Sequence, residues 1–212
     1  MSAAASISSL ELLVDDDVTL EAELSAPGVS DPRAAVVLCH PHPQYGGTMR
    51  SIVISELFRT LPTRGVVCLR FNFRGVEGST GAHDGGRGER ADAVAAIDAL
   101  AAAVTPTPII LAGWSFGGDV ALSVHDDRLA AWLAVAPPLH FADVEAVAAD
   151  PRPKHLVLAE HDEVRPPGDI ASAVDTWHAT TIEVVTGASH FFVGRTDAVI
   201  AAADHLIAEV AR

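Results

Sequence analysis

At the centre of the chain stands the sequence Pro108-Ile109-Ile110-Leu111-Ala112-Gly113-Trp114-Ser115-Phe116-Gly117-Gly118-Asp119-Val120-Ala121-Leu122-Ser123-Val124. Its first five residues are apolar and partly β-branched, which indicates a buried strand. The residues from Gly118 onward have the pattern of a helix, with Asp119 placed to favour its positive N-terminal end. The G-x-S-x-G pattern between them is typical of a nucleophile elbow, a sharp strand-to-helix turn that holds a serine hydroxyl clear of the backbone.

The two glycines of this pattern have a steric explanation. Side chains at positions 113 and 117 would collide where the strand and the helix pack closely. Backbone strain is tolerated where it presents a reactive atom. We therefore expect a strained turn at Ser115 and close packing at both glycines.

Apolar and amphipathic segments alternate on both sides of this turn. Two short alternating runs, 7–14 and 18–24, flank three aspartates and predict a β-hairpin. Further strands are expected at 34–39, 66–73, 108–112, 129–136, 155–159 and 181–185, and helices at 49–61, 89–104, 118–124, 141–148, 169–177 and 196–210. This alternation is typical of an α/β domain with a mostly parallel sheet and helices on both faces. No repeat or linker divides the chain, so we expect a single domain over residues 1–212.

Composition limits the classes of partner. The chain has 212 residues, 49% of them hydrophobic, with a net charge of −14 and a pI near 4.9. The acidic balance argues against nucleic acid and anionic membranes, because both require clustered Lys and Arg. No signal peptide or membrane span is apparent. Cys39 and Cys68 lie in apolar runs and are expected as reduced core thiols, which together predict a cytoplasmic protein. Nothing in the sequence decides the oligomeric state.

Polar residues gather where the expected strands end, which is where such sheets bind ligands. They are His40 and His42, Arg74, Ser115, His161 and Asp162, and Ser189 and His190. A serine hydroxyl needs a base to take its proton, and that base needs a third group to orient it. Ser115, Asp162 and His190 supply these three functions in the order Ser…Asp…His. Glu160 is the main alternative for the acid.

Two other patterns suggest cofactors but lack support. His40 and His42 could chelate a metal ion, but no third ligand stands at a convincing spacing, so we expect no metal. His40 is expected instead to brace its loop by hydrogen bonds. Residues 86–91 could pass for a dinucleotide fingerprint, but they do not directly follow a strand, so no cofactor is expected. The remaining histidines, such as His125, His155, His178 and His205, are expected on the surface or at solvent-facing helix positions.

An ordered set of motifs resembles the α/β-hydrolase superfamily, and more narrowly a group of small, lidless bacterial serine hydrolases. The motifs are His40-Pro41-His42-Pro43 with Gly46-Gly47, Leu69-Arg70-Phe71-Asn72-Phe73-Arg74-Gly75-Val76 leading to Ser79 and Gly81, Trp114-Ser115-Phe116-Gly117-Gly118, and Gly187-Ala188-Ser189-His190-Phe191-Phe192. They span almost the whole chain. Two positions depart from the pattern: Glu77 stands where the narrower group usually has glycine, and Pro41 stands where many relatives have glycine.

The resemblance implies the α/β-hydrolase fold, without a cap domain, and a Ser115–His190–Asp162 triad that transfers an acyl group to water. The backbone N–H of Phe116 is expected in the oxyanion hole, together with that of His42 or of Gln44, since Pro41 and Pro43 have none. Tyr45, Trp114 and Phe191 are candidates for an apolar substrate pocket.

The expected activity is hydrolysis of esters or thioesters of small acyl groups through an acyl-enzyme, because the connections are too short for a cap that would bury a long chain. The same triad would also serve an acyltransferase or a perhydrolase. The alternative from another class is a catalytically silent binding protein that retains the fold.

Overall fold

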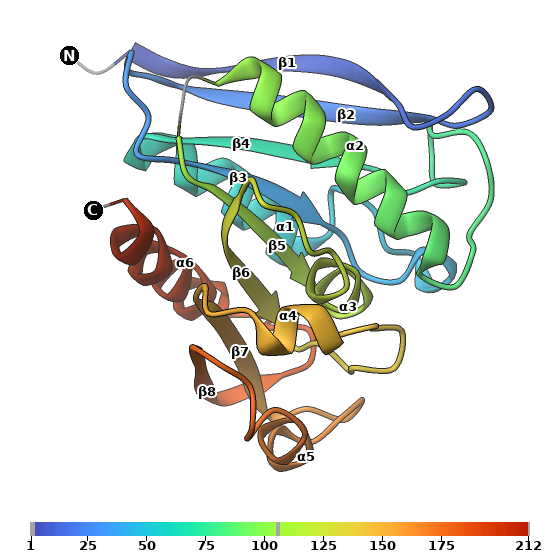
Figure 1. The fold of residues 1–212 in the computed structure, drawn as a ribbon. Helices are drawn as coiled ribbons and strands as arrows, with labels where there is room; N and C mark the ends of the chain where they lie inside the picture. The colour runs from blue at the N-terminus through green and yellow to red at the C-terminus, as the bar shows by residue number, and fades with distance from the viewer. Residues whose placement is uncertain (1–2, 105–106, 212) are drawn as a thin grey trace.

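The computed structural model of this protein describes residues 3–104 and 107–211. Within these residues, eight strands form one sheet in the order β1-β2-β4-β3-β5-β6-β7-β8 (Figure 1). The strands are β1 (Ala3–Leu13), β2 (Thr19–Gly28), β3 (Ala34–Cys39), β4 (Val66–Phe71), β5 (Ile109–Trp114), β6 (Leu129–Val135), β7 (Lys154–His161) and β8 (Thr180–Ser189). β1 and β2 form the antiparallel hairpin, β2 joins β4 in antiparallel register, and the strands from β4 to β8 run parallel. The predicted sheet is thus confirmed.

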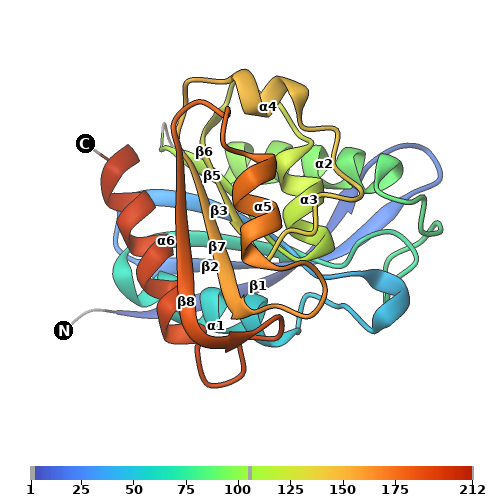
Figure 2. The same ribbon diagram turned by 90° about the horizontal axis from the view of Figure 1, so that it is seen from below.

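Helices cover both faces of the sheet, as expected. They are α1 (Ile52–Thr60), α2 (Arg87–Ala103), α3 (Phe116–Leu122), α4 (Glu145–Ala149), α5 (Pro167–Ala173) and α6 (Thr196–Val210), with 3₁₀ turns η1 (Pro43–Tyr45) and η2 (Leu61–Arg64). α1 and α6 pack on one face, and α2 to α5 pack on the other (Figure 2). The central strand β3 shows why both faces need cover. Its side chains alternate between the two cores, with Val37 in one and Val36 in the other, and both are buried.

Several boundaries differ from the expected ones. α1 begins at Ile52 rather than near 49, because the Thr48 N–H donates to Ser51 Oγ and the Ser51 N–H donates back to Thr48 O, closing a turn. Ile52, the first residue of the helix, is 40% exposed, whereas Val53 and Ile54 are buried. α3 begins at Phe116, directly after Ser115, and α4 begins at Glu145 rather than near 141.

One histidine is buried contrary to expectation. His155 lies near the start of β7 with only 4% of its surface exposed, because the inner strand positions of this sheet are covered on both sides. Burial lowers the pKa of its imidazole. His125, His178 and His205 are exposed, as predicted.

The two cysteines are free and buried, which confirms their assignment to the core. Burial raises the pKa of both thiols.

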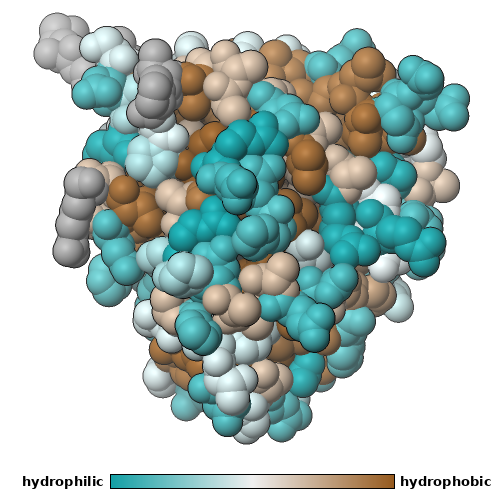
Figure 3. Space-filling view, viewed as in Figure 1, coloured by the Kyte–Doolittle hydropathy of each residue, from teal (hydrophilic) through white to brown (hydrophobic). Residues whose placement is uncertain are grey.

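No helix among residues 3–104 and 107–211 combines the length and the apolar character needed to cross a membrane. The face seen in Figure 3 mixes hydrophilic with hydrophobic side chains.

The connections at the carboxyl ends of the parallel strands are short. β6 and β7 are joined through a segment whose one helix, α4, has five residues. In the part of the chain that the structure describes, no cap domain covers this edge of the sheet. Side chains that follow β3, β5, β7 and β8 therefore meet at an edge that no cap covers.

Candidate active site

Ser115 occupies the strained turn that the sequence predicts. It lies between β5 and α3 with φ 55° and ψ −122°, a conformation that costs a residue with a Cβ on the order of 1–3 kcal/mol. Its N–H donates to Val135 O at 2.8 Å on the neighbouring strand. A Cβ atom at Gly113 would lie 2.0 Å from Gly117 O, and one at Gly117 would lie 2.2 Å from Cys39 O. Both positions therefore exclude any side chain.

Ser115, His190 and Asp162 come together at the carboxyl edge of the sheet. The Ser115 hydroxyl lies 2.9 Å from His190 Nε2. On the other side of the ring, His190 Nδ1 lies 3.0 Å and 2.9 Å from the two carboxylate oxygens of Asp162. His190 follows β8 and Asp162 follows β7, two adjacent parallel strands, so the sheet register fixes their separation. Both side chains are buried.

The acids near His190 differ in what they contact. Asp162 Oδ1 also accepts the backbone N–H groups of Val164 and Arg165, at 2.9 Å and 3.1 Å, which fixes the carboxylate toward the imidazole. Glu160 is exposed and accepts the N–H of Gly187 at 2.7 Å instead. Between the two acids that the sequence leaves open, the geometry favours Asp162.

The loop after β3 contains His42 and Gln44, the two candidates for the second oxyanion donor. Gln44 N–H donates to the Nδ1 atom of His42 at 3.2 Å, so that amide is already occupied. Among the described residues, the backbone N–H groups of His42 and Phe116 have no hydrogen-bond partner. The ring of His42 also packs against that of Phe116, with centroids 4.8 Å apart. These contacts favour His42 over Gln44 as the second donor.

His40 braces this loop, as predicted. It is fully buried, its Nδ1–H donates to Pro41 O at 2.6 Å, and its Nε2 accepts the N–H of Phe73 at 3.0 Å. An imidazole that both donates and accepts in this way is neutral. Burial lowers its pKa to about 4.

This buried imidazole should make the stability of the fold depend on pH. Between about pH 4 and the ordinary histidine pKa of 6.5, the unfolded chain binds a proton at position 40 that the native state does not. The free energy of unfolding should therefore rise with pH across this window, by at most about 1.4 kcal/mol per pH unit from His40. His40→Gln keeps an acceptor for Phe73 and should show a shallower slope in urea unfolding from pH 4 to 7. An unchanged slope would contradict this account.

The pocket beside Ser115 has a volume of about 680 Å³ and is largely apolar. All three residues expected at a substrate pocket line it, namely Tyr45, Trp114 and Phe191. Trp114 is buried, and its Nε1–H donates to His190 O at 3.1 Å, so it also holds the loop that carries His190. Tyr45 and Phe191 are 87% and 53% exposed and form the rim.

Asp119 has a structural role that the sequence pattern does not predict. It was expected only to favour the start of α3, but its buried carboxylate accepts three backbone N–H groups, from Leu139, His140 and Phe141, at 2.8 to 3.0 Å. Burial raises the pKa of this carboxyl group. These hydrogen bonds shape the loop after β6, which contributes His140 and Phe141 to the pocket. No local pattern marks this contact, because its partners lie about twenty residues downstream.

Other strand-end residues serve the fold. Arg74, which is partly exposed, forms an ion pair with the buried Asp92 on α2, with Nη2 and Oδ1 2.7 Å apart. His161 ends β7 at an exposed position.

Among the described residues, no group of three or more His, Cys, Asp or Glu side chains is arranged to hold a metal ion. Gly86 caps α2 after a loop rather than after a strand, unlike a dinucleotide fingerprint.

Comparisons with known proteins identify the superfamily of the chain. An uncharacterised protein of Rickettsia prowazekii is 32% identical over 181 residues, which cover 79% of this chain and 76% of the relative. The structure of an α/β serine hydrolase homologue from Coxiella burnetii superposes with a TM-score of 0.84 at 30% identity, over 96% of this chain and 97% of that one. The chain belongs to the α/β-hydrolase superfamily. No protein-family model matches it.

A second similar structure bears on the open edge of this α/β-hydrolase. It is a serine hydrolase without a lid from Xanthomonas campestris, with a TM-score of 0.82 at 27% identity, over 96% of this chain and 94% of the other. The absence of a cap among the described residues of this α/β-hydrolase matches that description. These neighbours support a hydrolase activity of the superfamily.

Proposed function

We propose that this α/β-hydrolase is a serine hydrolase of neutral carboxylic esters with small acyl groups. The observation that carries the proposal is the hydrogen-bonded series Ser115–His190–Asp162, with 2.9 Å at each step, which opens onto an apolar pocket. Such a series supplies a nucleophile, a general base and the group that orients the base.

The proposed reaction has two halves. Ser115 Oγ attacks the ester carbonyl carbon while His190 Nε2 takes the hydroxyl proton, and Asp162 stabilises the imidazolium. The N–H groups of Phe116 and His42 donate to the oxygen that becomes negative. The intermediate collapses, the C–O bond to the alcohol breaks, and His190 gives the alcohol its proton. Water then attacks the acyl-enzyme with the same base, which releases the acid and restores Ser115.

The charge of the pocket favours a neutral substrate. Among the described residues, no Asp, Glu, Lys or Arg side chain lines it. An acyl group on a phosphate-bearing carrier would need cations, and a chain of net charge −14 would repel it. Simple esters are therefore preferred over thioesters of such carriers. The exposed rim at Tyr45 and Phe191 leaves the pocket open to water as the acceptor.

Chain length should limit the rate. Without a lid, little acyl surface is withdrawn from water, so extra methylenes gain less than the ~0.8 kcal/mol of a fully buried one. We expect kcat/KM on p-nitrophenyl esters to be highest for acyl groups of roughly two to six carbons and to fall toward palmitoyl. A rise through the long-chain esters would contradict the size preference alone. Failure to turn over any ester in the series would contradict the hydrolase itself and favour a binding protein.

A further inference from the structure

The loop after β3, residues 40–51, is tied to the end of β4 at two points. At its start, His40 Nε2 accepts the N–H of Phe73 at 3.0 Å. At its end, the N–H of Met49 donates to Asn72 Oδ1 at 2.8 Å. The backbone N–H of His42, one of the two proposed oxyanion donors, lies between these attachments.

Asn72 uses every hydrogen-bonding group of its side chain. It is fully buried, and its Nδ2 donates to Glu21 Oε2 at 2.7 Å and to Glu77 Oε2 at 2.9 Å. Because ionised carboxylates only accept hydrogen bonds, these two partners require the NH₂ of the amide to face them. The amide oxygen must then face Met49. Glu21 and Glu77 thus fix the orientation of the side chain that holds the loop.

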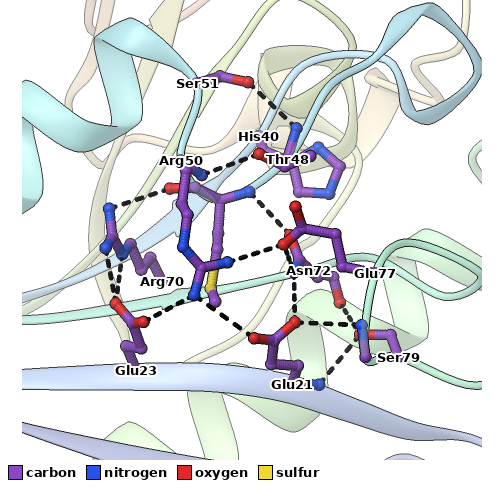
Figure 4. Close-up of polar contacts among 12 residues, drawn as sticks. Glu21, Glu23, His40, Thr48, Arg50, Ser51, Arg70, Asn72, Glu77 and Ser79 are labelled. Atoms are coloured by element: carbon purple, nitrogen blue, oxygen red, sulfur yellow. Dashed lines mark hydrogen bonds and ion pairs between the residues drawn. The ribbon is translucent and has the colours of Figure 1, made fainter.

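A second layer of charges holds the two glutamates. The Arg50 guanidinium lies 2.7 Å from Glu77 Oε2 and 3.5 Å from Glu21 Oε1 (Figure 4). Arg50 is the residue after Met49. The same loop therefore supplies the backbone N–H that donates to Asn72 and the guanidinium that pairs with Glu21 and Glu77. Glu77 holds this position although its φ of 48° lies in the left-handed region that favours glycine.

Met49 is held through both of its backbone groups. Its carbonyl accepts from Arg70 Nη1 at 3.2 Å, and its side chain is fully buried. Movement of this residue would require the loss of both hydrogen bonds in a region from which water is excluded. Asn72 therefore supplies one of the two hydrogen bonds that fix the backbone of Met49 at the end of the loop.

We propose that Asn72 is a positioning residue for the oxyanion loop. Through the Met49 amide it holds residues 40–51 so that the His42 N–H points at the developing negative oxygen, and Glu77 acts through Asn72. This inference rests on the proposed esterase activity. Oxyanion donors work only when they are already aimed at the place where charge develops, so a small displacement lowers the rate of the chemical step more than it weakens substrate binding.

The test separates the chemical step from binding. Asn72→Ala should lower kcat on a short-chain ester about 10- to 100-fold while KM changes by less than about threefold. A trifluoromethyl ketone inhibitor forms a hemiketal whose oxyanion occupies the same hole, so its affinity should fall in parallel with kcat. Glu77→Ala changes a half-exposed side chain and should give a smaller loss of the same kind, about two- to fivefold in kcat.

Glu56→Ala is the matched control. It breaks the exposed ion pair with Arg59 on α1, which has no contact with Asn72, and should leave kcat and inhibitor affinity unchanged. If Asn72→Ala does not fold, Glu77→Ala decides the question by the same readouts. Unchanged kcat and inhibitor affinity in the folded variants, with only a lower Tm, would overturn the inference. Wild-type protein that turns over no ester would instead overturn the proposed function.

Discussion

Ser115→Ala should lower ester turnover at least ~10³-fold while the protein folds normally, because the triad acts as a unit. The hydroxyl makes no capping hydrogen bond to α3, and its contact in the site is with His190. Alanine retains the Cβ of serine, so the backbone strain at φ 55° does not change. The measurement is kcat/KM on a short-chain ester, together with thermal unfolding. A fluorophosphonate probe should label Ser115 in the wild type and should not label the variant.

A second serine on the same helix provides the control. Ser123 caps the end of α3, where its hydroxyl donates to Asp119 O at 2.7 Å and accepts the N–H of Asp143. Ser123→Ala should cost some stability and leave the turnover and the probe labelling in place. If Ser115→Ala lost cooperative unfolding along with activity, Ser115 would be structural. If it retained activity, the nucleophile would lie elsewhere.

The turn at Ser115 was predictable because its causes are local. An apolar run, two glycines and an amphipathic run lie within seventeen residues, and each restricts the backbone of its neighbours. Even here the sequence missed one contact. The atom that excludes a side chain at Gly117 is Cys39 O, on the adjacent strand β3 rather than on the strand that enters the turn.

The residues around the candidate site were harder to assign, because their contacts join distant segments. Asn72 lies in a motif that marks the resemblance, yet its link to Met49, twenty-three positions earlier, depends on how β3 and β4 pair. The same holds for Asp119 and the loop after β6. A sequence pattern can place a residue at a strand end, but it does not say which of several neighbouring side chains the register brings within hydrogen-bond distance.

The acid of the triad is the case where this limit has a direct test. Glu160 lies near the end of β7, and Asp162 is the first residue after it. Residues two positions apart along a strand point to the same side, so strand geometry alone does not distinguish these two acids. The turn after β7 decides between them. It directs Asp162 at His190, and the N–H groups of Val164 and Arg165 hold the carboxylate there. Glu160 instead accepts the N–H of Gly187 on β8.

Asp162→Asn should therefore lower kcat by roughly 10³- to 10⁴-fold. An amide NH₂ facing His190 Nδ1 favours the imidazole tautomer that carries its proton on Nε2. A protonated Nε2 atom cannot accept the proton of the Ser115 hydroxyl. The variant should still fold, since the amide oxygen can accept the N–H groups of Val164 and Arg165. Glu160→Gln retains an acceptor for Gly187 and should change kcat by less than about threefold. Steady-state kinetics on one short-chain ester, with Tm for each variant, measures both effects. If the larger loss followed Glu160→Gln, the orienting role would belong to Glu160, and the series Ser115–His190–Asp162 would not be the working triad.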